Sequence, residues 1–150
     1  MSRWLTKIWV ALLAAFIAAQ FIPVNRQNPA EDPSRSLDAK EHVPPAVKTI
    51  LSRSCQNCHS NETSWPWYSY VAPASWMIAH DVHAARKKMN FSKWGDYTAE
   101  KREEKLEEIC EQINEGDMPD PKYLWLHRSA RMSRSDRETV CQWTEDSRQY

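Results

Sequence analysis

Glycine is scarce in this chain, with only two among 150 residues, against nine prolines and eight tryptophans. Proteins built from many short strands usually need glycine in their turns, and no useful stretch of this sequence alternates apolar and polar residues. No internal repeat occurs either. Because several charged stretches instead show helical periodicity, the sequence predicts an all-α fold.

An excess of charge of one sign is also missing, since 20 basic residues balance 20 acidic ones. No basic arm or stripe stands out, so nucleic acid is not an expected partner. The sequence lacks a phosphate-binding loop, a nucleophile paired with a base, and a pair of catalytic carboxylates. These absences argue against an enzyme with catalytic side chains of its own.

The one long apolar run covers residues 8–22 (IWVALLAAFIAAQFI), and Gln20 is its only polar residue. As a helix it would extend about 22 Å, which is short of the roughly 30 Å hydrocarbon core, and extending it to Trp4 and Val24 gives a marginal span. Arg3 and Lys7 precede the run, and a basic N-terminus favours the cytoplasmic side, so the rest of the chain would be exported. We predict a signal anchor at residues 1–22, with a cleaved signal peptide and a buried core helix as alternatives.

Beyond the apolar run, the chain divides into a linker and one domain. Residues 23–42 are polar and contain three prolines, which predicts a linker or extended arm. Residues 43–150 are numerous enough to form a single core. Apolar periodicity and capping patterns predict helices over residues 44–54, 75–89 and 99–115 and from 133 onward, with loops over 60–75, 91–97 and 118–121.

The strongest signal is Cys55-Gln56-Asn57-Cys58-His59, which has the C-x-x-C-H spacing of covalent c-type haem attachment. Two thiols must reach two vinyl groups on one edge of the porphyrin, and residues three apart share one face of a helical turn. The adjacent histidine is then carried to the ring, where its imidazole can bind iron. We therefore predict one covalent haem c at Cys55 and Cys58, with His59 as an iron ligand.

Three other interpretations of this motif are open. A thioredoxin-like redox pair expects a βαβ context, which the sequence lacks. A zinc site would need about four ligands, usually with a second close pair, and a plain disulfide between Cys55 and Cys58 is the third alternative. The predicted export of the chain and the helical context favour haem over all three.

Met118 is the leading candidate for the second axial ligand of the iron. It lies in the loop Gly116-Asp117-Met118-Pro119, where a methionine has less reason to belong to the core than one on a helix. Methionine and histidine ligands together raise the reduction potential, which suits electron transfer. His80 and His83, both in the helix predicted over 75–89, are the alternatives, and an open sixth position is another.

Several residues outside the motif are candidates for supporting roles. Cys110 and Cys141 each fall on an apolar helical face, so they are either a disulfide formed in an oxidising compartment or two buried thiols. Arg86, Lys87 and Lys88 could neutralise haem propionates, although a solvated basic face is the favoured interpretation. We also expect some of the aromatic residues that follow the motif to pack on the haem: Trp65, Trp67, Tyr68, Tyr70, Trp76 and Trp94.

Several ordered motifs resemble the bacterial haem-binding domain family of cytochrome-c-like proteins, over about residues 43–143. They are Cys55-x-x-Cys58-His59, Trp65-Pro66-Trp67-Tyr68, Ala72-Pro73-x-Ser75-Trp76, Asn90-Phe91-Ser92-x-Trp94 and Gly116-x-Met118-Pro119, with Tyr123 and His127 after them. The resemblance implies an exported, membrane-associated protein with one haem, attached at Cys55 and Cys58 and ligated by His59 and Met118. One departure is Ala85, where family members often carry glycine.

Taken together, these features predict a cytochrome-c-like helical domain that transfers electrons through one c-type haem. The alternative is a haem-based sensor or gas-binding module with a displaceable sixth ligand, and a small peroxidase is a further rival. The predicted location is the periplasmic side of the bacterial inner membrane, reached through the N-terminal segment. The expected partners are that membrane and a redox protein whose identity the sequence does not indicate.

Overall fold

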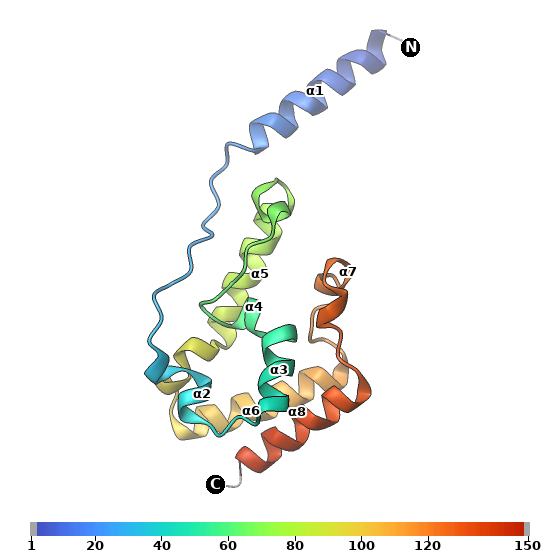
Figure 1. The fold of residues 1–150 in the computed structure, drawn as a ribbon. Coiled ribbons are helices and arrows are strands. Elements are labelled where there is room, and N and C mark those ends of the chain that lie inside the picture. The colour runs from blue at the N-terminus through green and yellow to red at the C-terminus, as the bar shows by residue number, and fades with distance from the viewer. Residues whose placement is uncertain (1–2, 149–150) are drawn as a thin grey trace.

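The structure is a computed structural model that describes residues 3–148, and every regular element in that range is a helix (Figure 1). This confirms the predicted all-α class. The α-helices are α1 (Arg3–Ala19), α2 (Leu37–Lys40), α3 (Pro45–Ser54), α4 (Gln56–His59), α5 (Ala74–Lys88), α6 (Ala99–Glu115), α7 (Tyr123–Leu126) and α8 (Arg134–Ser147). The 3₁₀ helices between them are η1 (Pro33–Arg35), η2 (Trp67–Tyr70), η3 (Phe91–Asp96) and η4 (Arg128–Ala130).

The core lies where α3, α6, α8 and η3 meet, and α6 and α8 pack together at the end of the molecule farthest from α1 (Figure 1). The apolar stripe predicted for residues 99–115 points into this core through Leu106, Ile109 and Ile113. A disulfide between Cys110 and Cys141 joins α6 to α8. The same two helices therefore hold each other by packing and by a covalent bond.

Capping residues mark the start of α6 and α8 and the end of α6. The Thr98 hydroxyl accepts a hydrogen bond from the backbone N–H of Lys101 at the start of α6. Gly116 ends α6 with a φ of 82°, a left-handed conformation that costs glycine little. Helix α8 begins with a capping box, in which the Ser133 hydroxyl accepts from the backbone N–H of Asp136 and the Asp136 carboxylate accepts from the backbone N–H of Ser133.

Asp136 is expected to make stability depend on pH. Its carboxylate accepts hydrogen bonds from the N–H of Ser133 (2.8 Å) and from Arg53 (2.9 Å), and these partners, Ser133 first, lower the pKa of Asp136. A carboxyl whose pKa is lower in the folded protein than in the unfolded chain stabilises the fold at pH values above its unfolded pKa, which is about 3.9. This stabilisation is lost as the pH falls through the folded pKa. Asp136→Asn should therefore cost about 1 kcal/mol in urea unfolding at pH 7.

The cost of Asp136→Asn should shrink when unfolding is repeated at acid pH, as the pH falls from the unfolded pKa of about 3.9 through the lower folded pKa and the wild-type carboxyl becomes protonated. Glu138→Gln is the matched control, because the ion pair of Glu138 with Arg134 is exposed and contributes little. An equal loss for Asp136→Asn at both pH values would contradict the assigned role of the charge.

The disulfide is expected to be a major source of stability. It closes a loop of 31 residues between α6 and α8, and the chain-entropy model gives about 3–4 kcal/mol for a loop of that length. Cys110→Ser/Cys141→Ser should lower the unfolding free energy by this amount in denaturant titrations. A reductant should destabilise the wild type equally and leave the double variant unchanged, and a reductant-insensitive wild type would refute the contribution.

The segment predicted as a linker over residues 23–42 is extended but is held against the domain. The Asn28 side chain donates to the carbonyl of Thr63 (2.9 Å), and the Asn61 side chain donates to the carbonyl of Ala30 (3.1 Å). The segment then forms η1 and α2, where Leu37 is buried in the core. Residues 23–42 are therefore not a free spacer, because their polar side chains and backbone hydrogen-bond to the domain and Leu37 packs in its core.

Helix α1 projects from the rest of the molecule, and none of its residues is buried (Figure 1). Its 17 residues extend about 26 Å. Within residues 3–148, no helix combines the length and the hydropathy that a membrane crossing requires. The transmembrane helix predicted from the apolar run is therefore not supported, since the helix ends at Ala19 and the run continues beyond it.

Candidate functional site

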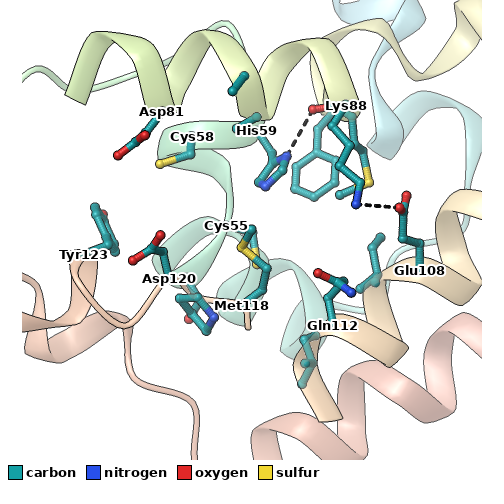
Figure 2. A pocket seen from close by; sticks show the side chains of 18 residues that line it. Cys55, Cys58, His59, Asp81, Lys88, Glu108, Gln112, Met118, Asp120 and Tyr123 are labelled. Carbon is teal, nitrogen blue, oxygen red and sulfur yellow. Dashed lines mark hydrogen bonds and ion pairs between the residues drawn. The ribbon is translucent and has the colours of Figure 1, made fainter. Parts of the chain in front are cut away.

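A cavity of about 300 Å³ lies between α4, α5, α6 and the loop after α6 (Figure 2). Its wall is mostly apolar, with polar side chains at its two ends. The residues that line it are Ser54, Cys55, Cys58, His59, Asp81, Ala84, Ala85, Lys88, Met89, Phe91, Glu108, Ile109, Gln112, Ile113, Met118, Pro119, Asp120 and Tyr123. A concave, mainly apolar site with a few convergent polar groups is typical of cofactor binding.

The C-x-x-C-H motif folds into a single helical turn at this cavity. Helix α3 ends at Ser54, and the carbonyl of Cys55 accepts hydrogen bonds from the N–H groups of Cys58 (3.1 Å) and His59 (3.0 Å). This turn is α4, and it directs all three side chains toward the same cavity. The spacing of the motif therefore produces the shared face that the sequence predicts.

His59 is oriented by the backbone. It is buried, and its Nδ1 lies 3.1 Å from the carbonyl oxygen of Met89. A carbonyl only accepts, so Nδ1 carries the proton and Nε2 keeps its free lone pair. Burial lowers the pKa of His59, which favours the neutral imidazole, although the hydrogen bond to Met89 opposes this shift. A neutral imidazole whose second nitrogen is anchored is suited to ligate a metal.

The two thiols are free and resist ionisation. Burial raises the pKa of Cys55 to about 12. Burial, reinforced by the charges of Asp81 and Asp120, raises the pKa of Cys58 to about 11. A reactive redox pair needs at least one thiol with a lowered pKa, so the raised pKa values of Cys55 and Cys58 argue against the thioredoxin-like alternative.

Met118 reaches the cavity from the loop after α6. Beyond Gly116, the N–H groups of Asp117 and Met118 both donate to the carbonyl of Gln112 (3.1 Å each), which fixes the start of the loop. Figure 2 shows His59 and Met118 on opposite sides of the cavity. The Met118 side chain is 37% exposed, so solvent reaches this side of the cavity.

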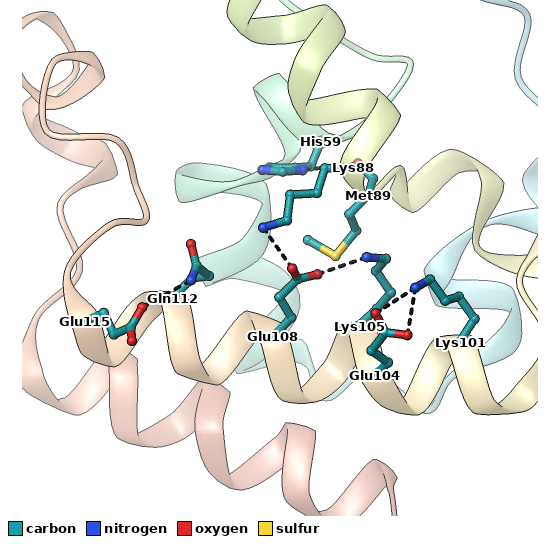
Figure 3. A network of polar contacts seen from close by, with 9 residues as sticks. All are labelled: His59, Lys88, Met89, Lys101, Glu104, Lys105, Glu108, Gln112 and Glu115. Carbon is teal, nitrogen blue, oxygen red and sulfur yellow. Dashed lines mark hydrogen bonds and ion pairs between the residues drawn. The ribbon is translucent and has the colours of Figure 1, made fainter.

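An ion-pair network borders one end of the cavity and ties α5 to α6 (Figure 3). The Glu108 carboxylate accepts from Lys88 (2.8 Å) and from Lys105 (2.9 Å). Burial raises the pKa of Glu108, but the two lysines outweigh it and the net pKa is lowered. Of the basic residues considered from sequence, Lys88 lines the cavity, whereas Arg86 instead binds the carbonyl of Ser60 (2.7 Å).

Other candidates from the sequence lie elsewhere. His80 is exposed, His83 contacts the carbonyl of Asn25 (3.1 Å), and neither lines the cavity. All eight tryptophans fall within the described residues, and none lines it either, which corrects the expected packing of tryptophans there. Trp94 is instead buried in the core and donates to Glu41 (2.7 Å), whereas Trp67 and Trp125 are exposed. The aromatic rings at the cavity are Phe91 and Tyr123.

Sequence reasoning missed the polar ends of the cavity. Asp81, Asp120 and Tyr123 border one end, and Glu108 and Gln112 border the other (Figure 2). Each lies on a helix or loop far along the chain from the motif, and no local pattern marks it. The zinc alternative also weakens, because residues 3–148 contain no group of three His, Cys, Asp or Glu side chains placed to hold a metal ion.

The fold and the cavity define an all-helical cofactor-binding domain that presents thiol, imidazole and thioether groups to one apolar space. The haem-binding domain family matches residues 14–146, and the chain belongs to this family. This confirms the family resemblance seen in the sequence, and the protein is a haem-binding protein. Comparison with curated proteins and with solved structures gives no match.

Proposed function

We propose that this protein carries one c-type haem in the cavity and transfers electrons through it. Cys55 and Cys58 would form the covalent attachments, and His59 and Met118 would ligate the iron. The observation that carries the proposal is the buried, neutral His59, whose Nδ1 is held by the Met89 carbonyl beside both thiols. The sulfur, imidazole and thioether donors match those that hold haem c.

The chain's own residues would bind, orient and shield the cofactor. Each thiol would add its sulfur and its hydrogen across one vinyl group, which requires no other reactant. The hydrogen bond to Met89 would hold the imidazole plane, while Phe91, Ile109 and Ile113 exclude water from the ring. When bound, the haem supplies reversible one-electron transfer at its iron.

A haem-based sensor is the second candidate, and one observation favours it. Met118 is 37% exposed on a loop, so a small molecule could displace its sulfur more easily than that of a buried methionine. A weak sixth ligand of this kind would also permit peroxidase-like turnover. We rank electron transfer first, since the thioether and imidazole pair favours it.

The proposed location is the periplasmic side of the bacterial inner membrane, with a redox protein as the functional partner. Support comes from the exposed apolar surface of α1, which water disfavours. Support also comes from the disulfide between Cys110 and Cys141, because such bonds persist mainly in oxidising compartments.

A pyridine haemochrome spectrum tests the attachment directly. The full chain is produced in a host with c-type maturation machinery, denatured, and separated from free haem. A c-type band that stays with the chain supports the proposal. A chain that binds haem when folded but loses it on denaturation would retain the family's haem binding and reject covalent attachment.

A further inference from the structure

The acidic residues are distributed unevenly along the chain. All 20 lie within residues 31–62, 81–120 and 136–146. The three segments 1–30, 63–80 and 121–135 therefore contain no acidic residue, and neither do the last four residues, 147–150. Basic residues do occur in two of these three segments, at Arg3, Lys7, Arg26, Lys122, Arg128, Arg131 and Arg134. A chain with no net charge thus contains separate segments whose charge is entirely positive or zero.

The three acid-free segments come together in the fold. Gln20, just after α1, accepts a hydrogen bond from the N–H of Ala72 (2.9 Å). The Arg26 guanidinium lies 4.4 Å from the centre of the Tyr70 ring. Tyr68 and His127 are joined by a hydrogen bond of 2.9 Å. Figure 1 shows α1, the start of α5 and α7 toward the same end of the molecule, with α6 and α8 at the other.

This end also exposes large apolar side chains. Trp67 is 78% exposed on η2, and Trp125 is 77% exposed on α7, with Leu126 beside it. Helix α1 adds Trp9 and Leu13. Tryptophan is enriched at the boundary between water and lipid, and exposed apolar residues beside arginine and lysine are typical of surfaces that bind anionic bilayers.

We propose that this end of the molecule, which we call the basic-aromatic end (α1, residues 63–80 and residues 121–131), binds the surface of an anionic lipid bilayer. The domain itself, and not only α1, would contact lipid. Charge complementarity selects this partner, because basic side chains outnumber acidic ones at this end. Asp81 and Asp120 border the cavity beside α7, and the basic residues of the acid-free segments here are Arg3, Lys7, Arg26, Lys122, Arg128 and Arg131. Tyr123 and Asp120 border the cavity beside α7, so the bound orientation would set one end of the haem site close to the membrane.

This proposal rests on the proposed membrane association of α1, and nitroxide labels on the full, haem-loaded chain can separate the two. Trp67→Cys places a label on η2, Trp125→Cys places one on α7, and Leu13→Cys places one on α1. Glu103→Cys, exposed on α6, is the matched control far from the basic-aromatic end. Cys110 and Cys141 are disulfide-bonded, and the wild-type chain treated with the same reagent is the blank.

Collision rates with oxygen and with a water-soluble nickel complex are compared for vesicles with and without phosphatidylglycerol. On anionic vesicles, the ratio of oxygen to nickel collisions should rise several-fold at positions 67 and 125 and stay constant at 103. A response at position 13 alone would overturn the proposal and leave the association of α1 intact. A lack of response at all positions would reject both, and an equal response on zwitterionic vesicles would overturn the choice of an anionic surface.

Charge variants give an independent test. Arg128→Gln/Arg131→Gln, carrying the label at position 125, should lose several-fold of its protection on anionic vesicles, while Arg128→Lys/Arg131→Lys should keep it. Both arginines are exposed, so the helix content in circular dichroism should be unchanged. If the label at position 125 were equally protected in the two double variants, electrostatic docking would be contradicted. The haemochrome test of haem attachment is independent of this result.

Discussion

Cys55→Ser/Cys58→Ser should abolish covalent haem attachment completely. Both sulfurs face the cavity from the same turn, and no other free thiol lies among the described residues. The double variant should therefore show no haem on the chain after denaturation. Each single variant should keep one attachment, and one unreacted vinyl group should shift its haemochrome band to longer wavelength.

The disulfide cysteines provide the control for this experiment. Cys110→Ser/Cys141→Ser also removes two sulfurs, but from the contact between α6 and α8, so it should lose stability and keep its haem. If the two double variants lost haem equally, the defect would lie in folding or maturation. A single variant without any covalent haem would show that two attachments are needed for either to survive.

Met118→Ala should convert the iron from six-coordinate low-spin to a form that binds carbon monoxide rapidly and completely. The loss of a thioether ligand should also lower the midpoint potential by on the order of 0.1 V, within the roughly 0.8 V range that axial ligands control. Optical spectra, carbon monoxide titration of the reduced protein and potentiometry measure these changes. Covalent attachment should be unaffected, because Cys55 and Cys58 are unchanged.

Met77→Ala is the matched variant, because Met77 is 55% exposed on α5 and does not line the cavity. It should behave as the wild type does in all three measurements. A wild-type protein that already binds carbon monoxide rapidly and fully would reject Met118 as a firm ligand. That result would favour the sensor function over electron transfer.

Local patterns predicted most of the helices. The apolar stripe predicted α6 at its observed bounds, Gly116 ends it, and Ser133 marked the start of α8. Short elements escaped prediction: η2 and η3 lie in segments expected to be loops, and α2 and α7 are single turns. One turn spans too few residues to show a helical period, so tertiary contacts decide whether it forms.

The motif predicted the location of the site better than its surroundings. Cys55, Cys58, His59 and Met118 do line one cavity, although their roles toward haem stay predictions. The aromatic residues near the motif were a poor guide, since proximity in sequence did not bring the tryptophans to the cavity. Lys88, Glu108 and Tyr123 border the cavity because α5, α6 and α7 meet there. The spacing of residues along the chain does not predict such a contact between separate helices.

The sequence by itself determined the all-α class, the long helices and the one turn that aligns two thiols with a histidine. It did so because capping, periodicity and C-x-x-C-H spacing act over a few residues. Only the tertiary structure decided that the Met89 carbonyl orients His59, that residues 23–42 lie against the domain, and that the acid-free segments share one end. These features depend on contacts between residues tens of positions apart, which packing alone brings together.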